Sequence, residues 1–196
     1  MAVGPFVVGV SGASGAVLAR RCVEMLLARD LPVSLVVTSV AAQIWQEELG
    51  CSLTESLMAW GERVRYYPAE QMRSPLASGS HPTAGMIVIP CSMATVSAIA
   101  HGSATTLLTR AADVCLKEGR RLVIVPRETP LSAIHLENLL RLARLGVRIV
   151  PPVPAFYTNP ASVADLVDCI AGRALDALGI SDGLPVIYRY NPEEEE

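Results

Sequence analysis

Glycines alternate with serines in one short segment of this sequence, and residues of these types can bind a phosphate. They are Gly9, Ser11, Gly12, Ser14 and Gly15. The segment closes an apolar run at residues 6–10. A glycine-rich turn between a strand and a helix exposes N–H groups and hydroxyls where an anion is favoured.

The segment differs from the GxGxxG motif of dinucleotide-binding proteins. A nicotinamide enzyme places an acidic residue after the second strand, but this chain has Thr38 and Ser39 there. A mononucleotide is therefore favoured over NAD. A tight turn without a ligand is the alternative.

Arg127 and Glu128 place a cation beside a carboxylate directly after another apolar run, at residues 122–125. Charged residues at the buried end of a strand rarely lack a role, because removing a charge from water is costly. We therefore favour ligand binding over a surface ion pair here. Arg110, Asp113 and Lys117 are spaced to share one helix face, for which a solvated face with an ion pair is an equally good explanation.

Small hydroxyl residues follow a third apolar run, at residues 86–89. The segment reads Pro90, Cys91, Ser92, Met93, Ala94, Thr95. A serine at this point caps a helix or binds a ligand, and capping is the commoner outcome. Since no histidine stands near Cys91 in the sequence, we do not expect catalysis by this cysteine.

Composition excludes several classes of protein. The formal net charge is -3, and Lys and Arg form no long run, so we expect no nucleic-acid partner. His81, His101 and His135 are scattered and the chain has no paired-aspartate motif, so we expect no metal. The 5 cysteines show no CxxC spacing, which favours reduced thiols in the cytoplasm. No apolar run is long enough to span a membrane.

The elements that position these residues alternate between strand and helix, which predicts a single α/β domain with an open, mainly parallel sheet between two helix layers. Strands are expected at residues 6–10, 33–38, 86–89, 122–125 and 147–150. Helices are expected at residues 16–29, 41–49, 51–59, 93–100, 105–117, 132–146 and 163–174. A long functional loop is expected at residues 68–85. The domain should cover residues 1–180, and residues 181–196, ending in four glutamates, should form a partly frayed tail.

At this point several long motifs together resemble one family, the UbiX flavin prenyltransferases. The motifs are GASGA from Gly12, PCSM from Pro90, TRAADV from Thr109, LKE from Leu116, PRETPL from Pro126, IHLEN from Ile134 and PPVPAFY from Pro151. They occur in the family's order and span about residues 6–180. The resemblance implies a Rossmann-like or flavodoxin-like fold in a cytoplasmic homododecamer.

The same resemblance implies an activity and its partners. Members of the family transfer a dimethylallyl group from dimethylallyl phosphate to N5 and C6 of reduced FMN without a metal. The product, prenylated FMN, serves a UbiD-type decarboxylase. Stabilising a departing phosphate with Arg and Lys donors is compatible with the absence of a metal motif.

Site residues follow from the resemblance position by position. FMN would be bound by Gly12, Ala13, Ser14, Ser39, Ser92, Met93, Ala94, Thr95 and Arg127. The prenyl phosphate would be bound by Arg110, Lys117, Tyr157 and Arg173. The catalytic residues would be Glu128, Glu48, Ser14 and Lys117, with Glu128 as the acid–base group. Glu47 is a rival to Glu48, because the match between Ser39 and Glu48 requires a deletion of one residue.

Two other functions stay open at this point. One is an FMN-dependent decarboxylase of peptidyl or pantothenoyl cysteine, a related fold that uses a different motif where this chain has the segment from Pro90 to Met93. The other is a carrier that binds FMN without catalysis. A carrier has no use for a second phosphate site, so the set of basic residues implied by the resemblance favours an enzyme.

Overall fold

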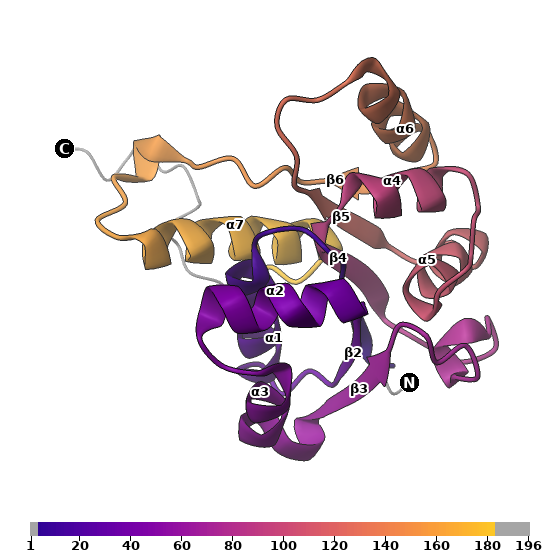
Figure 1. Ribbon diagram of the computed structural model, residues 1–196, viewed down its shortest axis with the longest axis horizontal. Helices are drawn as coiled ribbons and strands as arrows, with labels where there is room; N and C mark the ends of the chain where they lie inside the picture. Colours follow the sequence, from indigo (N-terminus) through magenta and orange to yellow (C-terminus); the bar gives the residue numbers. More distant parts are fainter. Residues whose placement is uncertain (1–3, 183–196) are drawn as a thin grey trace.

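The computed structural model describes residues 4–182 as six parallel strands and seven α-helices (Figure 1). The strands are β1 (Phe6–Val10), β2 (Val33–Val37), β3 (Val64–Pro68), β4 (Gly85–Cys91), β5 (Leu122–Pro126) and β6 (Arg148–Ile149). The helices are α1 (Ala16–Leu27), α2 (Ser39–Leu49), α3 (Leu53–Trp60), α4 (Met93–Ala100), α5 (Leu107–Lys117), α6 (Ala133–Arg144) and α7 (Val163–Leu178). Short 3-10 turns are η1 (Gly61–Arg63), η2 (Pro75–Ala77) and η3 (Phe156–Thr158).

The sheet has the strand order β3-β2-β1-β4-β5-β6, with every neighbouring pair parallel. This is the order of the Rossmann fold, in which the chain reverses direction of travel between β1 and β4. Ligands of such sheets bind beyond the carboxyl ends of the strands at that reversal. The expected fold class is confirmed.

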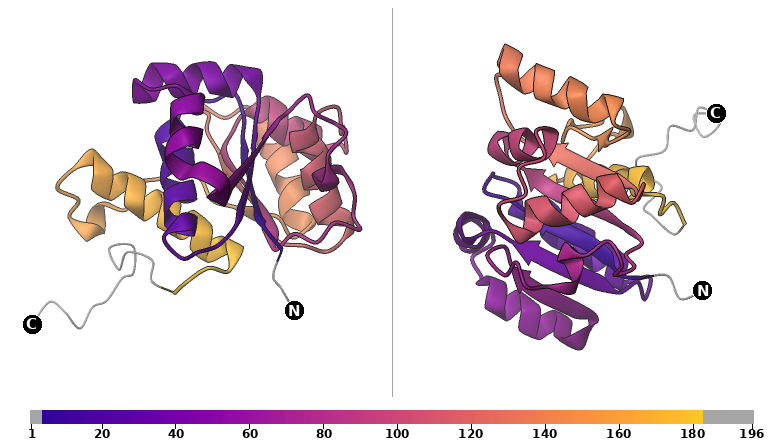
Figure 2. Two further views of the ribbon diagram at one scale, coloured as in Figure 1. Left: turned by 90° about the horizontal axis from the view of Figure 1, so that it is seen from below. Right: turned by 90° about the vertical axis from the view of Figure 1, so that its right-hand side faces the viewer.

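Alternating side chains of the strands build two hydrophobic cores. Val8 and Ile87 pack with α1, α2, α3 and α7 on one face, whereas Val7 and Val88 pack with α4, α5 and Leu142 of α6 on the other. Figure 2 shows the sheet between these two helix layers. Apolar side chains on both faces of a strand produce the continuous apolar runs of the sequence.

Three features of the sheet differ from the sequence prediction, the simplest being that β6 covers only Arg148–Ile149 of the expected residues 147–150. Strand β3 was not predicted, because an edge strand paired only with β2 buries Val64 and Tyr67 and leaves Arg65 exposed, which gives no continuous apolar run. Strand β4 was expected to stop before Pro90, but it continues to Cys91. The β4–β5 register shifts between Val88 and Cys91, and at such an irregularity a proline breaks no regular ladder hydrogen bond.

The end of the described chain is fixed to the domain. The Ser181 hydroxyl donates to Asp176 at 2.8 Å, and Arg29 donates to the Asp182 carbonyl at 2.8 Å. The first two residues of the expected tail are therefore held, while residues 183–196 lie outside the described part of the chain. Helix α7 also runs four residues beyond its predicted end and stops at the left-handed Gly179.

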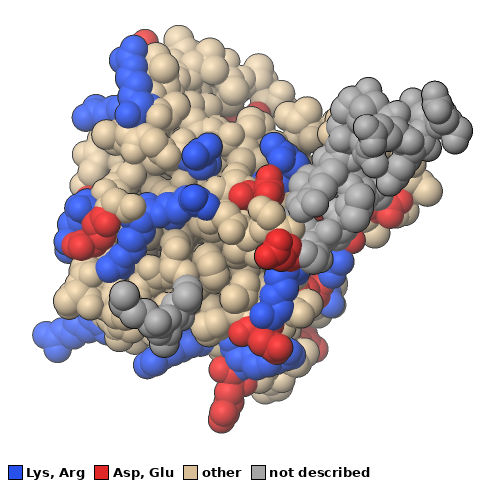
Figure 3. Space-filling view, turned by 180° about the vertical axis from the view of Figure 1, so that it is seen from behind, with Lys and Arg blue, Asp and Glu red and all other residues tan. Residues whose placement is uncertain are grey.

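Charged side chains pair locally on the surface. Arg21 of α1 donates to Asp168 of α7 at 2.5 Å, and this ion pair joins two helices of one layer. On the face seen in Figure 3, Lys and Arg lie in separate groups with uncharged surface between them, and several stand against Asp or Glu. None of the helices in residues 4–182 combines the length and the apolar character that a membrane crossing needs.

Candidate functional site

The carboxyl ends of β1 and β4 are joined by one buried serine. The Ser11 hydroxyl donates to the Pro90 carbonyl at 3.2 Å and accepts the N–H of Ser92 at 2.8 Å. Ser11 is only 1% exposed, so both bonds are shielded from water. The turn that follows β1 and the start of α4 are thereby fixed next to each other at the point where the strand order reverses.

Glu48, near the end of α2, binds the start of α1. Its carboxylate accepts the N–H of Gly15 at 3.0 and 3.1 Å and the N–H of Ala16 at 2.7 Å. The first N–H groups of a helix have no partner within the helix and attract negative charge. The Glu48 carboxylate therefore occupies the N–H groups of the glycine-rich turn at which the sequence suggested a bound phosphate. Glu47, its sequence rival, is exposed and has no comparable contact in the described structure.

The surroundings of Glu48 favour its charged form. Partial burial raises the pKa of the carboxyl, but hydrogen bonds from Ser14, Gly15 and Ala16 and the positive charge of Arg127 outweigh it, so the pKa lies below its ordinary value. The positive charge of Arg127, which follows β5, thus acts on the same carboxylate that the turn after β1 binds by hydrogen bonds. Glu48, Ser14 and Arg127, predicted from three separate segments, are brought together.

The lowered pKa of Glu48 predicts a pH dependence of stability. A carboxyl whose pKa is lower in the folded state stabilises the fold above its unfolded pKa, and this contribution disappears as the pH falls through the folded value. Glu48→Gln should therefore lower the thermal midpoint at pH 7, and the difference from wild type should shrink below the ordinary value of 4.5. Thermal unfolding of both proteins at pH 7 and pH 4 measures this. Glu47→Gln serves as the control, and an equal loss at both pH values would contradict the assignment.

A second set of backbone donors lies open at the start of α2. A Cβ on Gly12 would come within 2.8 Å of Val40, so the turn after β1 approaches α2 as closely as glycine allows. Thr38 caps α2 by accepting the N–H of Ala41 at 3.2 Å. Within residues 4–182, no hydrogen bond is shown for the N–H groups of Ser39 and Val40. These N–H groups and the exposed Ser39 hydroxyl fit a phosphate ester such as that of FMN.

Helix α4 presents a capped start to the same edge of the sheet. The Ser92 hydroxyl accepts the N–H of Thr95 at 3.3 Å and lies 3.0 Å from the Thr95 hydroxyl. The capping role considered for Ser92 is thus present. Ala94 is exposed, whereas the Met93 side chain is buried in the core. Met93 can therefore meet a flavin only through its backbone.

Arg127 and Glu128 begin the loop between β5 and α6. The Arg127 N–H donates to the Cys91 carbonyl at 3.1 Å, which ties this loop to the end of β4. Glu128 is exposed, and its Oε1 accepts the N–H of Thr129 at 3.0 Å. The carboxyl group is therefore held by its own loop and faces solvent in the single chain.

Lys117 and Arg110 lie elsewhere in the chain. Lys117 ends α5, and residues 118–121 lead from it to the first residue of β5. It therefore lies at the edge where the strands begin, whereas Glu48 lies at the edge where they end. Five residues of β1 separate the two edges by roughly 16 Å. A single chain does not bring Lys117 to Glu48.

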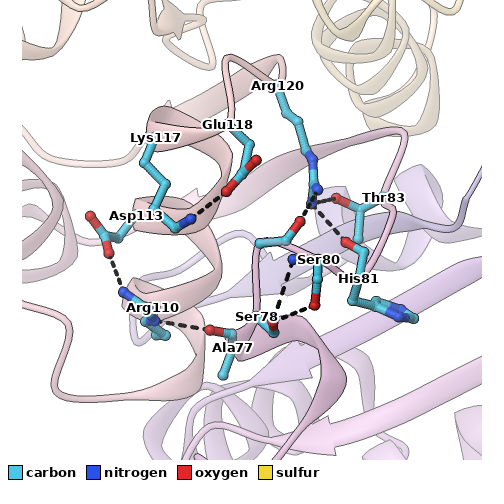
Figure 4. Close-up of polar contacts among 11 residues, drawn as sticks. Ala77, Ser78, Ser80, His81, Thr83, Arg110, Asp113, Lys117, Glu118 and Arg120 are labelled. Atoms are coloured by element: carbon cyan, nitrogen blue, oxygen red, sulfur yellow. Dashed lines mark hydrogen bonds and ion pairs between the residues drawn. The ribbon is translucent and has the colours of Figure 1, made fainter.

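The basic residues of α5 already have partners within the chain (Figure 4). Arg110 pairs with Asp113 at 2.6 Å, which is the ion pair considered for this helix face, and donates to the Ala77 carbonyl at 3.0 Å. The Lys117 ammonium pairs with the Glu118 carboxylate. Both residues border residues 77–83, part of the long loop that was expected to be functional.

Tyr157 and Arg173 lie in a third region. Tyr157 belongs to η3, in the segment between β6 and α7 that stands away from the sheet in Figure 1, and it is exposed. Arg173 lies on α7, where it pairs with Asp176 at 3.0 Å. The four residues expected to bind the prenyl phosphate therefore come from two different parts of the chain, and of these Lys117 does not reach the Glu48 site within one chain.

Ser11, which the sequence placed in the candidate phosphate-binding turn, is instead the buried link between β1 and β4 described above. Two further serines were not assigned a role from the sequence. Ser78 and Ser80, whose hydroxyls are 2.8 Å apart, lie in the segment that borders Lys117. Their position depends on contacts between distant parts of the chain, so only the Ser-Gly-Ser pattern within a loop could have drawn attention to them.

Neither a cluster of metal ligands nor a reactive form of the Cys91 thiol is found among the described residues. Residues 4–182 contain no group of three or more His, Cys, Asp and Glu side chains that could hold a metal ion. Cys91 is fully buried at the end of β4, and burial raises the pKa of its thiol far above the ordinary value. A thiolate nucleophile is therefore disfavoured at the strand end.

Comparisons with known proteins match nearly the whole chain. The Flavoprotein family model matches residues 4–175. A curated relative from Halalkalibacterium halodurans, named flavin prenyltransferase UbiX, is 46% identical over 188 residues that cover 92% of this chain and 91% of the relative. A dodecameric FMN-dependent UbiX-like decarboxylase from Escherichia coli O157:H7 has a TM-score of 0.89 at 41% identity and covers 95% of this chain and 99% of that chain.

A further solved structure was obtained with ligands. AnUbiX (PadA1), in complex with FMN and dimethylallyl pyrophosphate, has a TM-score of 0.89 at 39% identity, with 96% of this chain and 98% of that chain covered. The peptidyl-cysteine decarboxylase EpiD, of the class considered as a rival, has a TM-score of 0.58 at 17% identity. That likeness shows a shared fold alone.

Proposed function

The chain belongs to the Flavoprotein family and, within it, to the UbiX flavin prenyltransferases, and from this premise we propose how its residues perform the transfer. It is an enzyme that joins a dimethylallyl group to reduced FMN. FMN supplies the nucleophilic ring atoms N5 and C6, and the donor supplies the five-carbon group and its phosphate as the leaving group. The cysteine decarboxylase and the FMN carrier are not favoured by the comparisons.

The flavin end of the site lies at the carboxyl edge of the sheet. The Ser39 hydroxyl and the open N–H groups of α2 bind the FMN phosphate, since Glu48 already occupies the N–H groups of α1. Gly12 and Ala13 let the flavin approach the turn after β1, with Ser14 beside Glu48. The start of α4, residues 92–95, and Arg127 line the ring. This arrangement moves the phosphate from the glycine-rich turn, where the sequence alone suggested it, to the neighbouring helix.

The donor end requires a second copy of the chain. Arg110 and Lys117 lie far from Glu48 in one chain, so we propose that another copy presents them, with Ser78 and Ser80, to the prenyl phosphate. Tyr157 and Arg173 complete the phosphate site from a further surface. The dodecameric assembly of the related Escherichia coli protein supports such sharing, and we propose the same homododecamer here.

Glu128 acts as the general acid and base, and Glu48 lies next to the reacting carbon. As the bond between the allylic carbon and the phosphate oxygen breaks, its electron pair leaves with the phosphate, and Lys and Arg donors stabilise the charge. Glu128 donates a proton to this phosphate and later accepts one of the two protons that N5 and C6 lose, while the other saturates the double bond of the five-carbon group as its bond to C6 forms. We propose that the donor is the monophosphate ester and that a UbiD-type decarboxylase receives the product. We also propose a cytoplasmic location, which the five free cysteines of the chain support.

The observation that carries the proposal is the meeting of Glu48, Ser14 and Arg127 at the turn after β1, whose Gly12 approaches the open start of α2, in a chain that matches flavin prenyltransferases over most of its length. We expect the purified protein, given reduced FMN and dimethylallyl phosphate without oxygen, to form a flavin heavier by one C5 unit. Mass spectrometry of the extracted flavin measures this, with the diphosphate ester tested in parallel. Only unmodified FMN after long incubation would reject the proposal.

A further inference from the structure

Arg120 holds residues 77–83 against the end of α5. It lies in the turn between α5 and β5 and is half-buried. Its Nη2 donates to the Gly79 carbonyl at 2.6 Å, and its Nη1 donates to the His81 carbonyl at 2.9 Å and to the Thr83 hydroxyl at 3.1 Å. Figure 4 shows the guanidinium pointing into the loop, with these three bonds spread along it.

Other hydrogen bonds fix the two ends of the loop rather than its middle: Arg110 donates to the Ala77 carbonyl at 3.0 Å, and the Ala84 N–H donates to the Pro5 carbonyl at 3.1 Å. Apart from η2, residues 69–84 form neither helix nor strand. Within residues 78–81, the His81 N–H donates to the Ser78 carbonyl at 3.2 Å, and the Ser80 N–H reaches the Ser78 hydroxyl at 3.4 Å. Buried or half-buried carbonyls need donors, and the planar guanidinium supplies several in a fixed geometry. Arg120 is thus the main side-chain link between residues 79–83 and the domain, while Arg110 holds the neighbouring Ala77.

The same loop determines the surroundings of Lys117. A Cβ on Gly79 would lie 2.5 Å from the Lys117 Nζ and would also collide with Glu118, so the loop backbone runs directly against this ion pair. The Gly79 carbonyl is one of the three groups that Arg120 holds. Displacement of the loop would therefore change the space and the polar groups around the Lys117 ammonium.

We propose that Arg120 is a positioning residue for the prenyl donor, which acts by holding residues 77–83 beside Lys117. The inference rests on the proposed function, in which Lys117 binds the donor phosphate. Arg120 does not bind that phosphate itself, because its guanidinium is committed to three acceptors of the loop. Loss of Arg120 should therefore weaken donor binding and leave the flavin end, at the opposite edge of the sheet, unchanged.

Three variants of the full-length protein test the proposal. Arg120→Met removes the donors, Arg120→Lys keeps the charge without the planar fork, and Arg121→Met alters an exposed neighbour as the control. For Arg120→Met we expect the KM for dimethylallyl phosphate to rise about tenfold with kcat and FMN affinity near wild type, the scale of one or two lost hydrogen bonds. Arg120→Lys should restore part of the change, and Arg121→Met should resemble wild type.

Hydrogen exchange of residues 77–83 gives a readout that does not depend on turnover. We expect faster exchange in Arg120→Met and in Thr83→Val, which removes one acceptor and serves if Arg120→Met does not fold. A wild-type KM, or a raised KM with unchanged exchange in this segment, would overturn the proposal. If the wild-type protein produced no prenylated flavin, the proposed function would fail, whereas the exchange experiment would still show whether Arg120 holds the loop.

Discussion

Glu128→Gln is expected to slow prenyl transfer by roughly 10²-fold or more, the scale of a lost general acid, while FMN stays bound. Glutamine has nearly the shape of glutamate, and its amide oxygen can still accept the Thr129 N–H that Glu128 accepts at 3.0 Å. The loop after β5 should therefore keep its conformation. What is lost is a group that can donate a proton to the departing phosphate and later accept one.

The measurement is a single turnover under anaerobic conditions, followed by mass spectrometry of the flavin. FMN affinity, from the change in flavin fluorescence on binding, separates a loss of catalysis from a loss of binding. Glu137→Gln on the exposed side of α6 is a matched control, since it alters another glutamate of the same region without touching the loop. Wild-type rates in Glu128→Gln would remove this residue from the mechanism.

The general position of the site could be predicted because it depends on local patterns. Apolar runs such as Phe6–Val10 reveal buried parallel strands, and in an alternating chain the residues after each run must meet at one edge. Ser14, Ser39 and Arg127 were singled out as candidates in this way. Helix starts could also be predicted, since Ser132 caps α6 as its residue type suggests.

The remaining features depend on contacts that spacing cannot reveal. Glu47 and Glu48 are neighbours on one helix, and only the packing of α2 against α1 shows that Glu48 faces the Gly15 N–H. Arg120 reaches acceptors 37 to 41 residues earlier in the chain. Lys117 shares a helix face with Arg110 in the sequence, yet its distance from Glu48 follows from the parallel direction of the strands, because α5 ends where β5 begins.

That distance leads to the second large effect, a recovery of activity when two inactive variants are mixed. Glu48→Gln and Lys117→Met should each be nearly inactive, since one alters the group beside the reacting carbon and the other removes a cation from the departing phosphate, a loss on the order of 10²–10³-fold. If each site takes Glu48 from one chain and Lys117 from another, random assembly of the two variants leaves about a quarter of the sites with both residues intact.

The experiment is a co-expression of the two variants with different affinity tags, and tandem purification selects the mixed oligomers. Activity near one quarter of wild type is the expected result. A chain that carries both substitutions, mixed with wild type in equal amounts, provides the control: shared sites again give about a quarter, whereas sites built within one chain give about a half. Sites within one chain would also leave the two single variants inactive when mixed. That outcome would require Lys117 to reach the flavin of its own chain, but Lys117 lies just before the start of β5 in a parallel sheet, at the edge opposite to Glu48.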